Sequence, residues 1–310
     1  MKLYRDLAGE PLERPSSVSI GVFDGVHLGH QQLIRKVMYS AQSEGHLSGV
    51  VTFESHPDEL LAPQRGIRYL TTLEEKLHLL GTLGVDFVVA LPFTKELAKT
   101  TARDFVVALA DRLQMRDLWI GPDFSLGRGR QGSVDYLKGL AEELNFQIHI
   151  LQFFRDGGEV ISSTRIRSLI SEGRVSDAAR LLGRYPSISG AVVHGAHRGH
   201  ELGFPTANLS LDERMMTPPN GVYASRIGWD TVLHPGVVNI GRRPTFEEGS
   251  RPLLEAHVLD FQGDLYGKKV RVEFIERLRP EQRFNGAEAL ITQMQADAAQ
   301  ARLVLGELDS

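Results

Sequence analysis

A regular alternation of short apolar runs and amphipathic segments dominates the first half of the chain. Mostly apolar, β-prone runs occur at residues 18–22, 47–53, 86–91, 117–121 and 146–153. Segments with the spacing of amphipathic helices lie between them, at residues 31–41, 71–80, 101–113 and 133–144. The runs do not alternate between apolar and polar residues, which is typical of strands covered on both faces. The pattern therefore predicts a Rossmann-like α/β domain, in which a parallel sheet carries helices on both faces.

The second half of the chain has a different sequence pattern. Strand-like runs at residues 188–194, 221–227, 234–240, 253–259 and 269–274 are separated by turn residues, and a helical period returns only at 287–304. Several short strands at such spacing predict an antiparallel β-barrel or sandwich with one C-terminal helix packed on it. Pro186 and the change to β-type sequence mark the expected boundary, which divides the chain into domains of residues 1–184 and 185–310.

Composition narrows the classes of protein to which the chain can belong. With 310 residues, 42% of them hydrophobic, it is globular and long enough for two domains. The net charge of −4 gives no reason to expect nucleic-acid binding, and the lack of cysteine excludes disulfides. We expect no membrane span, since no apolar run approaches the roughly 18 residues that one needs, and no signal peptide, since residues 1–10 have no apolar core. These features predict a cytoplasmic protein.

Two histidines follow the first apolar run. The run meets Gly21 and Gly25 before a helical pattern begins, which predicts a strand, a tight turn and a helix start. His27 and His30 lie in this turn on either side of Gly29. A helix N-terminus attracts phosphate, and imidazoles add donors where charge grows during phosphate transfer. We interpret the turn as a nucleotide-phosphate site; the alternatives are a plain turn with solvent histidines and a zinc site, which the lack of cysteine disfavours.

Polar and aromatic residues also follow later strands. Ligands bind at the carboxyl edge of parallel sheets, and residues 27–30, 53–57 and 121–124 all lie at such strand ends. Residues 162–164 can cap a helix that has Arg165 and Arg167 in its first turns. Cations at that end oppose the helix dipole, so either an anion binds there or the arginines are ordinary surface residues.

The second half holds a glycine-spaced segment followed by two neutral oxygen donors. Glycines recur every four residues at Gly195, Gly199 and Gly203, which suits a loop over phosphates. Thr206 and Asn208 are two residues apart, so on extended chain they point to the same side. Their oxygens suit a hard cation that already carries phosphate and water, whereas the alternative is a polar turn in which the Asn bonds its own backbone.

Glu255 lies within an otherwise apolar strand-like run. Alternation along a strand places it on the same face as Leu253 and His257. A carboxylate among such neighbours is either a solvent-face residue or a positioned base.

Over nearly its whole length the sequence resembles one known family, the bifunctional prokaryotic riboflavin kinase/FMN adenylyltransferases, also called FAD synthetases. Eight stretches carry the resemblance in the family's order: GVFDGVHLGH (21–30), TFESHP (52–57), GPDF (121–124), ISSTRIR (161–167), GFPTANL (203–209), GVYA (221–224), NIGRRPTF (239–246) and DLYG (264–267). Any one stretch can arise by chance, but eight in order make chance a poor explanation.

The resemblance implies that the first domain is a nucleotidyltransferase, which joins FMN to the AMP part of ATP and releases pyrophosphate. It implies that His27 and His30 stabilise the departing pyrophosphate, that Arg167 acts on the triphosphate and that Asp123 orients a reactant. The other residues it implies are Gly21, Phe23, Gly25, Gly29, Ser163 and Thr164 for the nucleotide, and Phe53, His56 and Pro57 for the flavin.

The resemblance implies that the second domain is a β-barrel riboflavin kinase, which moves the γ-phosphate of ATP to the 5′-hydroxyl of riboflavin. It implies that Thr206 and Asn208 hold Mg²⁺, that Glu255 takes the proton of the hydroxyl, and that the glycine-spaced loop folds over ADP. The expected cofactor is Mg²⁺ and the expected partners are the substrates ATP, riboflavin and FMN. We expect no nucleic-acid or membrane partner, and a monomer or weak homo-oligomer.

The chain departs from the usual family pattern at three places. Ser125 and Leu126 stand where Arg and Phe are expected, which bears on the flavin pocket; His200 stands for Arg or Lys, and Tyr185 precedes Pro186 where the usual order is reversed. Three other interpretations are a chain with one active half, a nucleotide- or flavin-binding protein without turnover, and an adenylyltransferase for another nucleotide. The presence of both the His27–His30 pair and Glu255 argues against the first and third.

Overall fold

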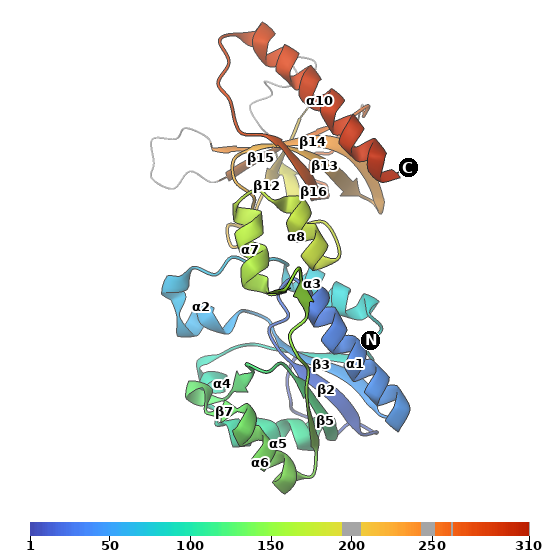
Figure 1. The fold of residues 1–310 in the computed structure, drawn as a ribbon, viewed down its shortest axis with the longest axis vertical. Helices are drawn as coiled ribbons and strands as arrows, with labels where there is room; N and C mark the ends of the chain where they lie inside the picture. Colours follow the sequence, from blue (N-terminus) through green and yellow to red (C-terminus); the bar gives the residue numbers. More distant parts are fainter. Residues whose placement is uncertain (194–205, 243–251, 262, 310) are drawn as a thin grey trace. The chain divides into compact units, whose positions relative to one another are not determined.

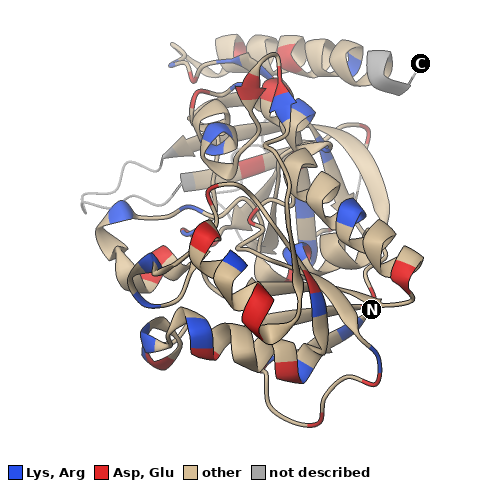
Figure 2. Ribbon diagram, turned by 60° about the horizontal axis from the view of Figure 1, so that its bottom comes forward, with Lys and Arg blue, Asp and Glu red and all other residues tan. Residues whose placement is uncertain are grey.

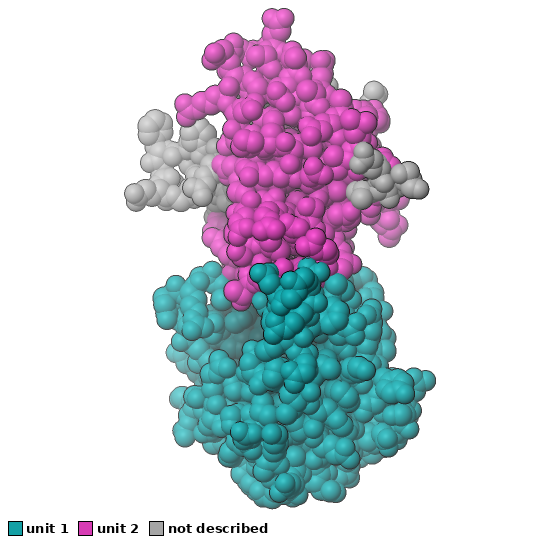
Figure 3. All heavy atoms as spheres, in the orientation of Figure 1, with its two compact units in different colours: residues 1–67, 71–162 teal, residues 68–70, 163–310 magenta. Residues whose placement is uncertain are grey.

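The structure is a computed structural model that describes residues 1–193, 206–242, 252–261 and 263–309. Its chain forms two compact units, residues 1–67 with 71–162 and residues 68–70 with 163–310, which are coloured separately in Figure 3. The units change at 162/163, ahead of the expected boundary at 184/185. The reason lies in two helices, α7 (Ser163–Ser171) and α8 (Val175–Leu182), which pack on each other while α8 also packs on a strand of the second unit.

A six-stranded sheet forms the centre of the first unit, with the strand order β1-β4-β3-β2-β5-β8. Its strands are β1 (Lys2–Tyr4), β2 (Ser16–Ile20), β3 (Leu47–Phe53), β4 (Phe87–Leu91), β5 (Met115–Ile120) and β8 (Gln147–Ile150). Every neighbouring pair is parallel, which confirms the predicted parallel sheet. The strand expected at 146–153 is shorter, because β8 pairs with β5 alone and their pairing ends at Ile120.

Helices cover both faces of this sheet (Figure 1). Val50 and Val88 pack into a core with α1 (Leu28–Glu44) and α3 (Leu73–Thr82), whereas Val51 and Val89 pack into a core with the helices of the opposite face, α5 (Ala102–Leu113) and α6 (Val134–Leu144). Successive strand residues therefore serve opposite cores, as the apolar runs predicted. Short elements that the sequence patterns did not predict complete the connections: α2 (Pro57–Leu61), η1 (Pro63–Arg65), α4 (Lys95–Lys99), β6 (Ser125–Leu126), η2 (Arg128–Arg130), β7 (Gly132–Ser133), β9 (Arg155–Asp156) and β10 (Glu159–Val160).

The second unit is a closed antiparallel barrel with the strand order β11-β12-β15-β14-β13-β16. Its described strands are β11 (Ser187–Val193), β12 (Ala207–Ser210), β13 (Gly221–Trp229), β14 (Val232–Arg242), β15 (Pro252–Val258) and β16 (Lys269–Arg279). This confirms the predicted barrel and adds β12, which is too short to show a periodic pattern. Closing the sheet pairs β11 with β16, so the interior is filled by a single apolar core.

The C-terminal helix α10 (Ala287–Asp309) packs on the outside of this barrel. Ala298 and Ala301 contact the apolar cluster that includes Ala224 of β13. Asp297 of the helix accepts two hydrogen bonds of 2.8 Å from Arg279 of β16, and both side chains are largely buried. The predicted helix is thus confirmed, together with its packing on the barrel.

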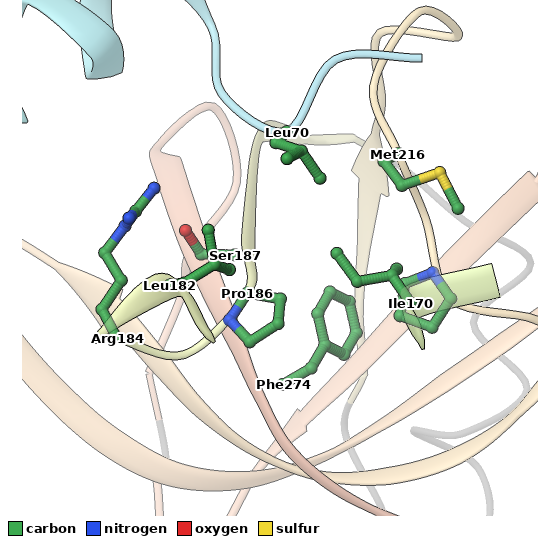
Figure 4. Close-up of a pocket in the computed structure, with 9 residues that line it drawn as sticks. Leu70, Ile170, Leu182, Arg184, Pro186, Ser187, Met216 and Phe274 are labelled. Atoms are coloured by element: carbon green, nitrogen blue, oxygen red, sulfur yellow. The ribbon is translucent and has the colours of Figure 1, made fainter. Parts of the chain in front are cut away.

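One small cavity lies within the second unit, among Leu70, Ile170, Met216 and Phe274 (Figure 4). Its volume of about 10 Å³ is close to the least that one water molecule needs. It is therefore a packing gap rather than a ligand site.

Charges of both signs are interspersed over the helices and loops (Figure 2). None of the helices in the described residues is both long enough and apolar enough to cross a membrane.

Candidate active sites

The turn between β2 and α1 has an unusual backbone. Phe23 and Val26 have φ angles of 52° and 38°, left-handed values that side-chain-bearing residues, and β-branched ones above all, rarely adopt. Such strain costs roughly 1–3 kcal/mol at each residue. Both side chains are buried in the core that α1 and α3 form, and this burial offsets the strain.

His27 is the N-cap of α1. Its Nδ1 accepts a hydrogen bond of 3.3 Å from the main-chain N–H of His30. This bond leaves the proton of a neutral His27 ring on Nε2. Gly29 makes room for the ring, since a Cβ at that position would lie 3.2 Å from it. Gly21 has a similar task, because its Cβ would lie 3.1 Å from the Phe23 ring.

His30 stacks on His27, with ring centroids 3.5 Å apart, and meets the Phe23 ring edge-on. Its Nδ1 is buried and has no hydrogen-bond partner among the residues that the structure describes. Burial lowers the pKa of His30 well below 6.5, and the nearby His27 and Lys76 lower it further. His30 is therefore neutral at pH 7 and acts as a polar group without a full charge.

Thr71, just before α3, stabilises the same turn through two hydrogen bonds. Its main-chain N–H donates to Asp24 Oδ1 at 3.2 Å, and its hydroxyl oxygen accepts from the N–H of Gly25 at 3.2 Å. Asp24 is buried, so this pairing satisfies a carboxylate that has little access to water. Gly25 has a φ of 80°, which explains why glycine is required there.

Lys76 of α3 also stabilises this turn through hydrogen bonds to the main chain. Its Nζ donates to the carbonyl oxygens of Val22 at 3.1 Å and Phe53 at 2.7 Å. The sequence contains a signal for this residue: Lys76 lies three residues after Leu73 and four before Leu80, on the apolar stripe of the predicted helix, where a lysine is out of place unless it has a buried partner.

Further predicted residues follow β3 and β5. The Phe53 ring meets Phe93 edge-on, at a centroid distance of 5.3 Å. His56 is the N-cap of α2, where its Nδ1 accepts from the N–H of Asp58 at 3.1 Å, and Pro57 is the first residue of that helix. Asp123 is exposed in the turn after β5.

Because β2, β3 and β5 are adjacent and parallel, the structure brings these residues to one edge of the sheet, with the His27–His30 turn. The capping role of His56 is a structural task that its position in the sequence did not reveal.

Ser163, Thr164 and Arg167 belong to the second unit. They lie in the first turns of α7, as predicted, and Arg167 donates from Nε to the carbonyl oxygen of Arg68 at 2.7 Å. Their action on a triphosphate stays a prediction. Gly195, Gly199 and Gly203 lie outside the described residues, as does His200.

Strand register places three polar residues side by side on the barrel. Asn208 of β12 is opposite Glu255 of β15, which is in turn opposite Asn239 of β14. The residues that alternate with them, such as Leu209 and Leu254, fill the barrel interior, so all three polar residues belong to its outer face. Opposite residues of antiparallel strands have Cβ atoms about 4.5–5.5 Å apart, which is within reach for their side chains to act together.

Exposure along β15 confirms the predicted face of Glu255. Leu254, Ala256 and Val258 are buried in the barrel core, while Leu253, Glu255 and His257 are partly exposed. Glu255 is therefore partly exposed on the outer face of the barrel.

Asn208 has the features of a cation ligand. It is 4% exposed, and its Oδ1 is buried without a hydrogen-bond partner among the described residues. A buried amide oxygen left in this way is costly unless something polar binds it. Since the described residues contain no cluster of three His, Asp or Glu side chains able to hold a metal, a cation here would depend on neutral oxygens and on phosphate. Thr206, two residues earlier, can supply a second such oxygen.

Comparison with known proteins divides the chain between two enzyme families. Residues 10–165 match the FAD synthetase family, and residues 182–305 match the riboflavin kinase family. The first match contains the His27–His30 turn, and the second contains Asn208 and Glu255. The chain belongs to the family of bifunctional riboflavin kinase/FMN adenylyltransferases.

Individual members of this family are similar over almost their full length. The bifunctional riboflavin kinase/FMN adenylyltransferase of Escherichia coli is 39% identical, over 99% of this chain and 98% of its own. That of Listeria monocytogenes is 34% identical, over 94% and 93%. A crystal structure from Streptococcus pneumoniae, described as a macrolide-efflux protein, is 29% identical with a TM-score of 0.89, over 97% of this chain and 98% of that one. The fold is thus shared along the whole chain.

Proposed function

We propose that this chain makes FAD from riboflavin in two steps, with the principal residues of each reaction in a different unit. The barrel unit phosphorylates riboflavin to FMN, and the parallel-sheet unit joins FMN to AMP from ATP. The observation that carries the proposal is that each family match contains one set of polar residues already in place: the stacked His27 and His30 in the first, and the paired Asn208 and Glu255 in the second.

In the first unit, an FMN phosphate oxygen attacks the α-phosphorus of ATP, and the bond from that phosphorus to the bridging oxygen of pyrophosphate breaks. This transfer needs no covalent enzyme intermediate, so positioning and charge stabilisation carry the catalysis. Negative charge grows on the departing pyrophosphate. Nε2–H of His27 donates to it, and the N-terminus of α1 adds partial positive charge. His30, kept neutral by burial, stabilises the phosphates by hydrogen bonding rather than as a cation.

The remaining residues of this reaction have supporting tasks in the proposal. Gly21, Phe23, Gly25 and Gly29 shape the nucleotide-binding turn, and Asp123 orients a reactant. Phe53, His56 and Pro57 line the flavin pocket, where His56 also caps α2 through its Nδ1. Ser163, Thr164 and Arg167 act on the triphosphate.

In the second unit, Glu255 takes the proton of the riboflavin 5′-hydroxyl, whose oxygen attacks the γ-phosphorus as ADP leaves. Asn208 and Asn239 flank Glu255 in the strand register. Thr206 and Asn208 are the residues that would hold Mg²⁺, an assignment supported by the unpartnered Oδ1 of Asn208. When bound, Mg²⁺ neutralises charge on the ATP phosphates.

Several expectations from the sequence remain part of the proposal. The two activities are divided between residues 1–184 and 185–310, and the loop containing Gly195, Gly199 and Gly203 folds over ADP. The chain works as a monomer or weak homo-oligomer without nucleic acid or membrane. Its use of ATP in both steps supports a cytoplasmic location.

Chromatography of flavins tests the two-step proposal. The chain is incubated with riboflavin, ATP and Mg²⁺, and FMN is expected to rise first and FAD to follow. A second incubation starts from FMN, which isolates the adenylyl transfer. Unchanged riboflavin in the first incubation and unchanged FMN in the second would show a binding protein without turnover.

A further inference from the structure

We infer that Lys76 is a positioning residue for FAD formation, whose ammonium group holds the His27–His30 turn in its strained conformation. The inference rests on the proposed assignment of adenylyl transfer to that turn. Lys76 lies on α3, far from the turn in sequence, and is 6% exposed.

The contacts of Lys76 join two segments of the proposed site. Val22, whose carbonyl oxygen is 3.1 Å from Nζ, immediately precedes Phe23, the first of the two residues with left-handed φ. Phe53, whose carbonyl oxygen is 2.7 Å from Nζ, begins the segment that we assign to the flavin. One ammonium group therefore ties the start of the phosphate-binding turn to the start of the flavin segment.

The turn depends on such external restraints. Its left-handed residues are unfavourable by themselves, so the conformation that stacks His27 on His30 must be stabilised by surrounding groups. Thr71 restrains it through Asp24 and Gly25, Lys76 restrains it through Val22, and the Thr52 hydroxyl also donates to the Val22 carbonyl oxygen at 3.0 Å. Thr71 and Lys76 come from the segment 71–76, so the start of α3 is one support of the turn, and Lys76 is its only charged donor among these three.

The charge of Lys76 gives it a second effect. Burial lowers the pKa of Lys76 to about 8, although the carboxylates of Asp24 and Glu54 raise it. At pH 7 the group is therefore still a cation, and its charge contributes to the low pKa of His30. Charged donors also make stronger hydrogen bonds than neutral ones. A leucine or methionine would fill this place on the apolar stripe without a buried charge, so the choice of lysine points to a task beyond packing.

The test compares Lys76→Met with Lys36→Met, which removes an exposed lysine of α1 in the same unit. FAD formation from FMN and FMN formation from riboflavin are measured on each preparation between about pH 6.5 and 9.5. We expect Lys76→Met to lower kcat/KM for FAD formation by about tenfold or more at pH 7, with FMN formation within about twofold of the parent chain. In the parent chain, FAD formation should fall at alkaline pH with a midpoint of about 8, and Lys76→Met should lack this fall.

Normal FAD formation by Lys76→Met, or the same alkaline fall in that variant as in the parent chain, overturns the inference. If Lys76→Met does not fold, Lys76→Gln takes its place and is judged by the same criteria. His27→Ala distinguishes a failure of the site assignment from a failure of the role given to Lys76. If it retains FAD formation, the site assignment fails; if it loses FAD formation while Lys76→Met does not, only the role of Lys76 fails.

Discussion

The two proposed sites are built in different ways. In the first unit, the His27–His30 turn has left-handed backbone, and Thr71 and Lys76, from the start of α3 and the residues before it, help to hold it in place. In the second unit, Asn208, Glu255 and Asn239 stand on regular strands, and hydrogen-bonded register alone sets their spacing. The first site is thus made by tertiary contacts of a loop, and the second by the regular geometry of a sheet.

This difference predicts how each site responds to substitution. A turn that depends on contacts from another helix should lose function when residues outside it change, as the test of Lys76 examines. A row of residues on a barrel face should depend mainly on the side chains of that face, because the ladder of main-chain hydrogen bonds persists when one side chain is replaced.

The largest effect is expected at Glu255. Removal of a general base typically costs ~10²–10⁴-fold in rate, so Glu255→Gln should lower kcat for FMN formation by that amount. FAD formation from supplied FMN should be unchanged, as should the thermal midpoint, since the side chain is partly exposed and the strand pairing remains. Both rates are measured by flavin chromatography. Loss of both activities in folded protein would contradict the division between the units.

His27 should show a smaller effect with two components. Loss of one donor to a developing charge costs roughly 10²–10³-fold, so His27→Ala should lower FAD formation by that factor and leave FMN formation intact. Loss of the N-cap should also lower the free energy of unfolding by about 1 kcal/mol.

His27→Ser is the matched control for His27→Ala, because serine caps a helix without an imidazole. It should restore the free energy of unfolding but not FAD formation. Recovery of both would mean that His27 acts only as a cap.

Substitutions of Asn208 should change the Mg²⁺ dependence of FMN formation. Asn208→Leu removes the buried Oδ1 and should raise the Mg²⁺ concentration for half-maximal FMN formation by roughly 10–100-fold. Asn208→Asp keeps an oxygen in the same place and should retain Mg²⁺ dependence close to that of the parent chain. Titration of FMN formation with Mg²⁺ measures the shift. An identical titration curve for Asn208→Leu would remove Asn208 from the cation site.

The smallest expected effect is the contribution of His30 to the pH dependence of the free energy of unfolding. Burial lowers the pKa of His30 well below 6.5, so the unfolded chain binds this proton at a higher pH than the folded chain does. The contribution of His30 is therefore present above pH 6.5 and is lost as the pH falls from 6.5 toward the lower folded value.

Denaturant unfolding of the parent chain and His30→Gln, between about pH 7.5 and 5, measures that contribution by difference. The stability of the parent chain relative to the variant should decrease as the pH falls. A difference that stays constant over this range would show that His30 titrates alike in the folded and unfolded chains.

Much of the fold and part of each site follow from local patterns. Runs of apolar residues predicted the parallel sheet, short β-type runs predicted an antiparallel barrel or sandwich, and alternation along β15 predicted the face of Glu255. The His27–His30 turn was predicted because a strand, glycines and a helix start are adjacent in sequence. In each case the relevant residues lie within a few positions of one another, where spacing translates directly into geometry.

The tertiary structure decided what depends on distant segments. Lys76 meets Val22 across 54 positions and Asn208 meets Glu255 through strand pairing, and local spacing does not identify the partner in either contact. The short strand β12, the cap formed by His56, and the inclusion of α7 and α8 in the second unit also became visible only in three dimensions. The physical reason is that main-chain carbonyl and N–H groups occur at almost every residue, so the partner that a side chain finds among them is set by how the chain packs.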